Sequence, residues 1–370
     1  MTFLLAERDT VSTAILTSGV ALGVHVPGLL LARRLAEAGV PARVDVFERH
    51  LPSDQRDRIA ASMVAFHRNF RFAKAGLRMA GRNAVGLGAD AVAGLLDNWA
   101  ADQVEQLVVL SGFWMPAAHE YAVRHPGTRV HACHVDTVAS PSFAAEVSQV
   151  PDAHRRQVEH HDFWLLEQRA GSVARTIPVS HDDPLPWSAR NGRLLAHGGG
   201  WGMGTYATDA DELAAKGFPL DLIAYEHADV TAPAGGRRYF MIDPGWRPWH
   251  DNGFPPFGQV DANGQVRFER GQAHHDSFHL TRSALAVLSK PGGGTLMDSL
   301  AAATPLVLLD PFGDHEAHNA ALWRRLGFGI YFADWVRGGC DVAQLERLHH
   351  NLLAARPHVT SYPNALVSRN

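Results

Sequence analysis

The sequence predicts an α/β protein built from two doubly wound, Rossmann-like domains that face each other across a cleft. The chain has 370 residues, more than one domain usually holds, so two domains are expected. Short apolar runs alternate with amphipathic helical patterns, as they do when helices cover a parallel sheet. A glycine-bearing loop after the first strand is echoed by a richer glycine loop at 198–204. We expect one domain at 1–187, a second at 188–345, and a C-terminal tail at 346–370.

Composition argues against several classes of partner. The formal net charge of −4 lacks the basic excess of a nucleic-acid-binding protein. No apolar run reaches the length of a transmembrane helix, and the first residues lack the basic-then-apolar pattern of a signal peptide. Cys133 and Cys340 stand far apart with no disulfide framework around them, which favours a reducing compartment. We therefore expect a cytoplasmic protein.

The first domain opens with a strand–loop–helix–strand unit. An apolar run at 11–16 predicts the first strand. Ser18 and Gly19 follow in a loop that is expected to hold a phosphate group or an acceptor substrate. Pro27, a residue favoured in the first turn of a helix, is expected to open an amphipathic helix. The run at 42–47 predicts the second strand and completes a βαβ unit.

A basic helix is expected at 54–82, because apolar residues recur there at three- and four-residue steps. Its many cationic side chains have two interpretations: a solvated face of a core-packed helix, or a patch for an anionic acceptor or an anionic membrane surface. A helix at 89–101, strands at 106–111 and 128–135, and a helix at 145–170 complete the domain.

Two polar residues mark the expected cleft. Asp136 follows the strand at 128–135, and open α/β sheets bind ligands beyond the carboxyl ends of their strands. It should face the same cleft as His25, which comes in the loop before Pro27. Both residues have a structural alternative: Asp136 caps a loop, and His25 caps or packs at the start of the helix.

The second domain begins after a proline-bearing linker at 178–191. A strand at 193–196 runs into the second glycine loop, which contains Gly199, Gly200, Trp201 and Gly202. These glycines serve either a phosphate group or only tight turning and close helix packing. Strands at 220–224 and 238–242 and an irregular insertion at 245–264 follow.

No metal site is expected. Asp209 and Asp211 are better placed to cap a helix than to bind a cation. His274, His275 and His279 lie close together in the sequence, but no nearby cysteine or acidic pattern completes a zinc site around them.

The stretch at 284–319 is expected to bind a phosphate group. An apolar strand leads to Lys290 and then to Gly292, Gly293, Gly294 and Thr295, where a helical pattern begins. Backbone N–H groups and the positive end of the helix dipole converge there, and glycine lets an anion approach the backbone closely. Asp298 lies one turn beyond Thr295 on the same face, where a carboxylate suits paired ribose hydroxyls.

The letters SKPGGGTLMDSLAAATPLVLLDP, followed by HEAHNA, resemble the donor-binding half of the GT-B nucleotide-sugar glycosyltransferases. The similar branch contains the peptidoglycan N-acetylglucosaminyl transferase, the diacylglycerol glycosyltransferases and the UDP-glycosyltransferases. The resemblance implies that Asp298 binds the donor ribose and that Glu316 and Asn319 bind the donor sugar. It also implies that the loop at 199–202 lies near the donor diphosphate and that His274 lies near the nucleotide base. By the same resemblance, the tail at 346–370 is expected to pack back on the first domain.

The resemblance implies transfer of a sugar from a nucleoside diphosphate sugar, expected to be UDP-linked, to a hydroxyl of a small-molecule acceptor such as a specialised metabolite. No other cofactor is implied. His25 is the first candidate for the general base, although in the family the histidine lies three residues before the proline and here it lies two before Pro27. Asp136 is the second candidate, as the base or as the group that orients His25.

Inversion at the anomeric carbon is expected, because His318 stands eight positions after Asp310, where retaining enzymes of this fold often carry a second acidic residue. Two alternatives remain open. The protein could be a glycolipid synthase with weak contact to a membrane surface. It could also be an epimerase, a phosphorylase or a non-catalytic binder of sugar nucleotides with the same fold.

Overall fold

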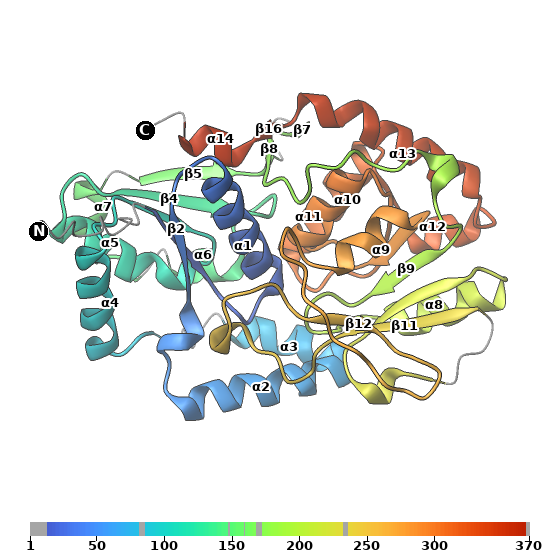
Figure 1. Ribbon diagram of the computed structural model, residues 1–370, viewed down its shortest axis with the longest axis horizontal. Coiled ribbons are helices and arrows are strands. Elements are labelled where there is room, and N and C mark those ends of the chain that lie inside the picture. Colours follow the sequence, from blue (N-terminus) through green and yellow to red (C-terminus); the bar gives the residue numbers. More distant parts are fainter. Residues whose placement is uncertain are drawn as a thin grey trace, which may run out of the picture.

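The computed structural model describes residues 13–80, 86–146, 149–158, 160–167, 172–231 and 236–367. Two mainly parallel sheets, each flanked by helices, lie side by side (Figure 1). The predicted α/β class is therefore confirmed. None of the described helices combines the length and the apolar composition that a membrane crossing requires.

The first sheet has the strand order β2-β1-β3-β4-β5, and every neighbouring pair is parallel. Its strands are β1 (Thr13–Thr17), β2 (Ala42–Val46), β3 (Gln106–Val109), β4 (Arg129–His134) and β5 (His160–Trp164). All five residues of β1 are buried, as expected for a central strand with helices on both faces.

The second sheet has the order β12-β11-β10-β9-β13-β14-β15, with only the edge strand β12 antiparallel. Its strands are β9 (Leu194–His197), β10 (Leu220–Ala224), β11 (Arg237–Ile242), β12 (Phe257–Gln259), β13 (Ala286–Ser289), β14 (Leu306–Leu308) and β15 (Gly329–Tyr331). The six parallel strands follow the order of the dinucleotide-binding Rossmann fold.

The helices that cover the first sheet are α1 (Leu22–Glu37), α4 (Ala89–Ala101), α5 (Met115–Arg124), α6 (Pro141–Glu146) and α7 (Asp152–Gln157). Those of the second half are α8 (Tyr206–Ala215), α9 (Ser277–Ser283), α10 (Gly293–Ala302), α11 (Asp314–Arg325), α12 (Phe332–Arg337) and α13 (Val342–Ala355). Near the C-terminus, β16 (Thr360–Ser361) pairs with β8 (Arg175–Thr176), and α14 (Tyr362–Val367) brings Tyr362 against Phe163 of β5.

Helix α1 starts five residues before the predicted position at Pro27. Residues 22–26 continue the helix backward, and Pro27 lies inside it. Because proline has no N–H group, it cannot bond to the carbonyl of Gly23 four residues before it. The helix packs closely on β1 at Gly28, where a Cβ atom would lie 2.3 Å from Cγ2 of Thr17.

The single helix predicted at 54–82 is two helices, α2 (Ser53–Arg68) and α3 (Phe70–Ala80). Asn69 separates them in an extended conformation, and its side-chain oxygen accepts a hydrogen bond from Phe72 N at 2.9 Å. This is the contact of a helix N-cap, which hydrophobic spacing alone does not reveal. Residues 81 and 82 of the prediction lie outside the described residues.

The helix predicted at 145–170 is wrong over most of its described residues. Within that part of the range, only 145–146, at the end of α6, and 152–157, in α7, are helical, while β5 pairs with β4 from Val130 to His134. The aromatic residues of the segment therefore fill one edge of the sheet, where their bulk and β propensity suit a strand.

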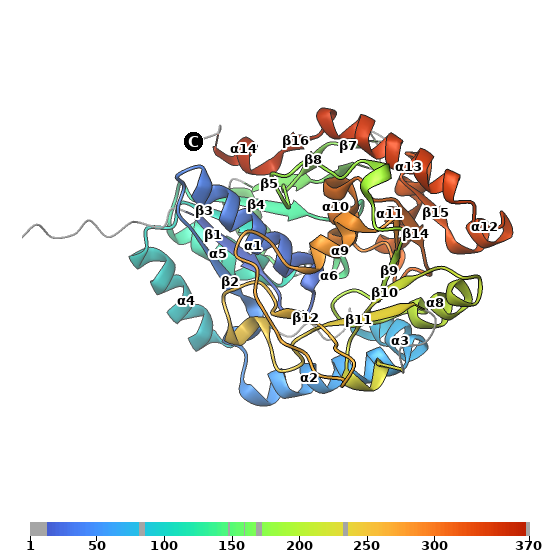
Figure 2. The same cartoon turned by 45° about the vertical axis from the view of Figure 1, so that its right-hand side comes forward.

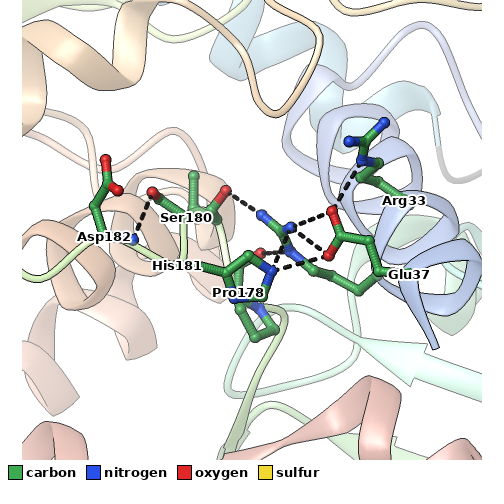
Figure 3. A network of polar contacts seen from close by, with 8 residues as sticks. Arg33, Glu37, Pro178, Ser180, His181 and Asp182 are labelled. Carbon is green, nitrogen blue, oxygen red and sulfur yellow. Dashed lines mark hydrogen bonds and ion pairs between the residues drawn. The ribbon is translucent and has the colours of Figure 1, made fainter.

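The linker between the two sheets is bound to α1 by Arg34, and Figure 3 shows Pro178 and His181 of the linker beside Glu37 of α1. Its guanidinium donates hydrogen bonds to Pro178 O at 2.9 Å and Val179 O at 2.7 Å. Glu37 bonds to Arg33, Arg34 and His181. Burial acts against ionisation of Glu37, but the bonds from His181 and the two arginines lower its pKa to about 2.

Helices α2 and α3 leave the first sheet and run beneath the second (Figures 1 and 2). Arg68 pairs with Glu226 at 3.2 Å, and Lys74 lies 3.9 Å from Asp310. Two cationic side chains of this segment therefore bind carboxylates of the second domain. Neither interpretation of the sequence anticipated this arrangement.

Candidate active site

The two sheets turn their carboxyl edges toward each other. Successive strands are added in one direction across each sheet and then in the other. This reversal falls between β9 and β13 in the second sheet and between β1 and β3 in the first. Open α/β sheets bind ligands at such switch points. The N-termini of α1 and α10 meet there, since a Cβ atom on Gly294 would lie 3.3 Å from Cα of Gly23.

The N-terminus of α10 is closely approached by the first domain. Gly292 is the N-cap, and a Cβ atom on Gly293 would lie 2.6 Å from the Val135 carbonyl oxygen. The carboxylate of Asp136 lies beside Gly293, since a Cβ atom there would lie 3.0 Å from Oδ1, and the Gly293 amide acts to lower the pKa of Asp136. The carboxylate of Asp136 therefore lies where the predicted phosphate group would bind.

Asn319 joins the same contact from α11. Its amide donates to Asp136 Oδ1 at 2.7 Å and to Pro291 O at 3.0 Å, while its oxygen accepts from Thr137 N at 2.9 Å. Burial raises the pKa of Asp136, against the lowering effects of His315 and Asn319. The structure thus brings together Asp136, Asn319 and the glycines after Lys290, although they were predicted for different roles.

His25 lies on α1 and is fully buried. Its Nδ1 is 3.2 Å from the hydroxyl of Thr17, and that hydroxyl donates its own proton to Asp45 O at 3.3 Å. Both contacts of the Thr17 hydroxyl are satisfied together only when Nδ1 carries the proton, which leaves the lone pair on Nε2. Nε2 is buried without a hydrogen-bond partner among the described residues.

Burial, followed by the nearby charge of Arg49, lowers the pKa of His25 to about 3, and Asp251 acts weakly in the opposite direction. His25 is thus a neutral imidazole at physiological pH, able to accept a proton but weakly basic. Asp136 bonds to Asn319 on α11, and the group that orients His25 is Thr17.

Lys290 and Glu316 form a buried ion pair beside the glycine loop after β9. Nζ of Lys290 is 3.5 Å from Glu316 Oε1, and Phe312 N donates to Oε2 at 2.6 Å. A Cβ atom on Gly199 would lie 3.7 Å from the same Nζ atom. The predicted donor residues Lys290, Glu316 and Gly199 therefore lie together. Thr295 lies in the first turn of α10 and is half-buried.

Asp298 faces a histidine that the sequence did not single out for the donor site. Its Oδ1 is 3.2 Å from Nε2 of His275, whose Nδ1 is 2.8 Å from the Ser277 hydroxyl. Burial lowers the pKa of His275, but the charge and hydrogen bond of Asp298 raise it by more, so the pKa lies above its ordinary value. His274 points elsewhere, with its ring against Phe278.

His197 is a second residue that the sequence did not single out. It ends β9 at the switch point, and its Nδ1 accepts a hydrogen bond from Gly199 N at 3.1 Å. Burial lowers its pKa to about 4, while the charge of Asp298 acts to raise it. The sequence signal that could have identified His197 is its position as the last residue of a strand before a glycine loop.

The loop after β1 already encloses a carboxylate. The Ser18 hydroxyl donates to Glu48 Oε1 at 2.5 Å, and Gly19 N donates to Oε2 at 2.6 Å. Burial raises the pKa of Glu48 in spite of these bonds. Ser18 and Gly19, predicted to hold a phosphate group or the acceptor, thus bind a side chain from the end of the neighbouring strand.

The glycine loop after β9 contacts the first domain. The indole N–H of Trp201 donates to Val20 O, and a Cβ atom on Gly200 would lie 2.6 Å from Cγ of Leu22. Gly202 accepts a hydrogen bond from His67 on α2 at 2.8 Å. The loop therefore forms part of the interface between the two domains.

A cavity of about 520 Å³ lies between α1, β2 and the segments at 252–254 and 270–272. Arg33, Arg43, Arg49 and Arg270 line it, together with apolar side chains that include Leu29. Leu29 is one helical turn from His25, on the same face of α1. None of the predicted donor residues lines this cavity.

One group of side chains within the described parts of the chain has the spacing of cation ligands: His67, Glu226 and Asp229. The three histidines considered for zinc at 274–279 do not form such a group among the residues that were placed.

No protein-family model matches the sequence, and no curated protein matches it. Solved structures match over nearly the whole chain. The glycosyltransferase SsfS6 of Streptomyces sp. SF2575, in complex with thymidine diphosphate, is 15% identical with a TM-score of 0.59 and covers 97% of this chain and 100% of its own. MurG of Acinetobacter baumannii is 15% identical, with a TM-score of 0.53 and coverages of 97% and 98%.

The spinosyn rhamnosyltransferase SpnG, in complex with spinosyn aglycone, is 14% identical with a TM-score of 0.56 and covers 96% of this chain and 99% of its own. At these identities the likeness establishes the fold. The chain has the GT-B fold, with two Rossmann-like domains, as predicted.

Proposed function

We propose that the protein is a metal-independent, inverting glycosyltransferase that moves a sugar from a nucleoside diphosphate sugar to a hydroxyl of a small-molecule acceptor. One observation carries the proposal. The N-terminus of α10, Lys290, Asp298 and Glu316 converge at the switch point of the second sheet, and His25 lies across the interface on the helix that meets α10. In the proposed roles, the first group binds the donor and His25 activates the acceptor.

The leaving diphosphate is the charge that the site must stabilise. In a single displacement, the acceptor oxygen bonds to the anomeric carbon, the bond from that carbon to the diphosphate breaks, and the acceptor proton passes to His25 Nε2. The amides at the start of α10, its dipole and Lys290 would then face the negative charge that develops. One displacement inverts the anomeric carbon.

In this proposal the donor phosphate takes the position of the Asp136 carboxylate beside Gly293, so Asp136 must move when the donor binds. We infer that the closed arrangement is a resting state in which Asp136 occupies the phosphate position. The domains must separate enough for the donor to displace it, and Asp298 is proposed to bind the ribose by charge-assisted hydrogen bonds.

A small-molecule acceptor is favoured over a lipid by the basic helices. Arg68 and Lys74, which could have faced an anionic membrane, pair with second-domain carboxylates instead. SpnG was solved with an aglycone and SsfS6 with thymidine diphosphate, so we propose a specialised-metabolite acceptor and a uridine or thymidine diphosphate sugar as the donor.

The test is a screen of nucleotide sugars by thermal shift, followed by calorimetry on each one that stabilises the protein. We expect a uridine or thymidine diphosphate sugar to bind and Asp298→Asn to weaken it. Absence of binding by every nucleotide sugar would contradict the proposal.

A non-catalytic sugar-nucleotide-binding protein is the second candidate, favoured by the environment of His25. Its Nδ1 bonds to a hydroxyl, and its pKa is lowered to about 3, so the imidazolium formed during transfer would be poorly stabilised. Donor binding without release of nucleoside diphosphate, in the presence of a broad acceptor panel, would favour this candidate.

A further inference from the structure

We propose that His67, in its protonated form, is a positioning residue that holds the glycine loop after β9 in place for the donor. The donor part of this inference rests on the proposed function. The interdomain contact itself does not, and it can be tested in the ligand-free protein.

His67 lies in the last turn of α2, and both of its ring nitrogens face oxygen atoms of the second domain. Nδ1 is 2.8 Å from the Gly202 carbonyl, and Nε2 is 3.0 Å from Asp229 Oδ1. A carbonyl and a carboxylate oxygen only accept hydrogen bonds. A neutral imidazole has one N–H group, so both contacts are satisfied only when the ring is an imidazolium.

The two acceptors are held in fixed positions. Oδ2 of Asp229 accepts hydrogen bonds from Tyr225 N at 2.9 Å and Glu226 N at 3.0 Å, which leaves Oδ1 for His67. Gly202 has a φ of +58°, and a Cβ atom there would lie 2.5 Å from Cβ of Tyr225. The ring of His67 lies against the ring of Tyr225, with centroids 4.6 Å apart.

The glycine loop after β9, to which His67 bonds at Gly202, also contacts residues of the proposed donor site. Gly199 bonds to His197, and Gly199 and Gly204 lie against the side chain of Lys290. Trp201 stacks on Phe66, the residue before His67, with ring centroids 5.6 Å apart. Loss of the His67–Gly202 contact would therefore free the loop beside Lys290.

The charged groups that face His67 are Asp229 and Glu226 from the loop after β10, and Arg68 on its own helix, which pairs with Glu226. Burial lowers the pKa of His67, but the bonds to Asp229 and Gly202 and the charge of Glu226 raise it above 6.5 overall. A raised pKa means that the contact contributes fully below pH 6.5. That contribution is lost as pH rises through the folded-state value.

The experiment compares the wild-type protein with His67→Gln and with His227→Gln, which removes an exposed histidine two residues before Asp229. Donor affinity is measured by calorimetry between pH 6 and 8.5, with UDP-glucose and TDP-glucose, whose diphosphate diesters do not titrate in this range. We expect wild-type affinity to fall by up to about tenfold per pH unit above the His67 pKa. The His227→Gln protein should behave alike, and His67→Gln should bind weakly at every pH.

A second measurement needs no ligand. In a histidine NMR titration of the full chain, we expect the rings of His67 and His275 to titrate above pH 6.5, and only the His67 signal to be absent from the spectrum of His67→Gln. A His67 pKa below 6.5 would overturn the inference. So would a His67→Gln protein that keeps the wild-type pH dependence, or a wild-type affinity restored at high pH by Zn²⁺ and abolished by EDTA. If neither nucleotide sugar binds, the donor role falls with the proposed function, whereas the titration decides the protonated contact separately.

Discussion

At the scale of single residues, the environment of His25 combines a fixed tautomer with low basicity. The Thr17 hydroxyl oxygen accepts a hydrogen bond from the N–H group at Nδ1. Nε2 is therefore the atom that would receive the proton of the acceptor hydroxyl. We expect His25→Gln to lower turnover by about 100- to 10,000-fold while donor affinity stays near its original value. Single-turnover assays and calorimetry measure the two quantities. Undiminished turnover would assign the base elsewhere.

Substitution of Asp136 distinguishes its two candidate roles, because donor affinity and turnover change differently in each. If its carboxylate only occupies the phosphate position at Gly293, as we propose, Asp136→Asn removes an anion that competes with the donor and should tighten donor binding. If Asp136 is the base, the same change should lower turnover and leave affinity unchanged. Calorimetry with the donor, paired with a transfer assay, separates these results.

Asp298 is expected to bind the donor ribose. Asp298→Asn should weaken donor binding by about 1.5–3 kcal/mol, because hydrogen bonds to a charged acceptor are replaced by neutral ones. The variant also loses the charge that raises the pKa of His275, so that pKa should fall. The matched control is Asp334→Asn, on the surface helix α12. Equal affinities of Asp298→Asn and the wild-type protein would remove Asp298 from the site.

At the scale of elements, the start of α10 serves the contact between domains. A methyl group at Gly293 would lie 2.6 Å from the Val135 carbonyl, so Gly293→Ala should force the domains apart. Gly94→Ala is the control, because Gly94 is inside α4 with open space around it and alanine should stabilise that helix by about 0.5–1 kcal/mol. Small-angle scattering should show a larger radius of gyration for Gly293→Ala alone. An unchanged radius would contradict this account.

Hydrophobic runs and glycine loops were enough to predict the central strands of both sheets, because a strand buried on both faces needs little else in its sequence, but the edge strands β5, β12 and β15 were not predicted. They were not enough at Asn69, where a side-chain cap divides α2 from α3, or at 160–164, where pairing with β4 makes a strand of a segment predicted to be helical. The same limit applies to the candidate site. Asp298 and Lys290 could be selected by spacing, but the partners of Asp136, His67 and Glu48 come from elements distant in sequence.

At the scale of the whole molecule, buried neutral histidines should make the fold sensitive to acid. Burial lowers the pKa of His25 to about 3 and those of His119 and His197 to about 4. In the unfolded chain each titrates near 6.5. Below that pH the unfolded state binds more protons than the folded state, so stability falls as pH drops from 6.5 toward these values.

Each of these histidines can contribute up to about 1.4 kcal/mol per pH unit to the loss of stability. His67 and His275, whose pKa values are raised, act in the opposite direction between about pH 6.5 and their folded-state values, so the decline should be steepest on the acid side of 6.5. Urea unfolding at pH 7.5, 6.5, 5.5 and 5.0 measures it. His119→Gln removes one of the three groups far from the proposed donor site and should flatten the decline, whereas His358→Gln, at an exposed position, should not. A His119→Gln protein whose free energy of unfolding declines as steeply as that of the wild-type protein between pH 6.5 and 5.0 would contradict this account.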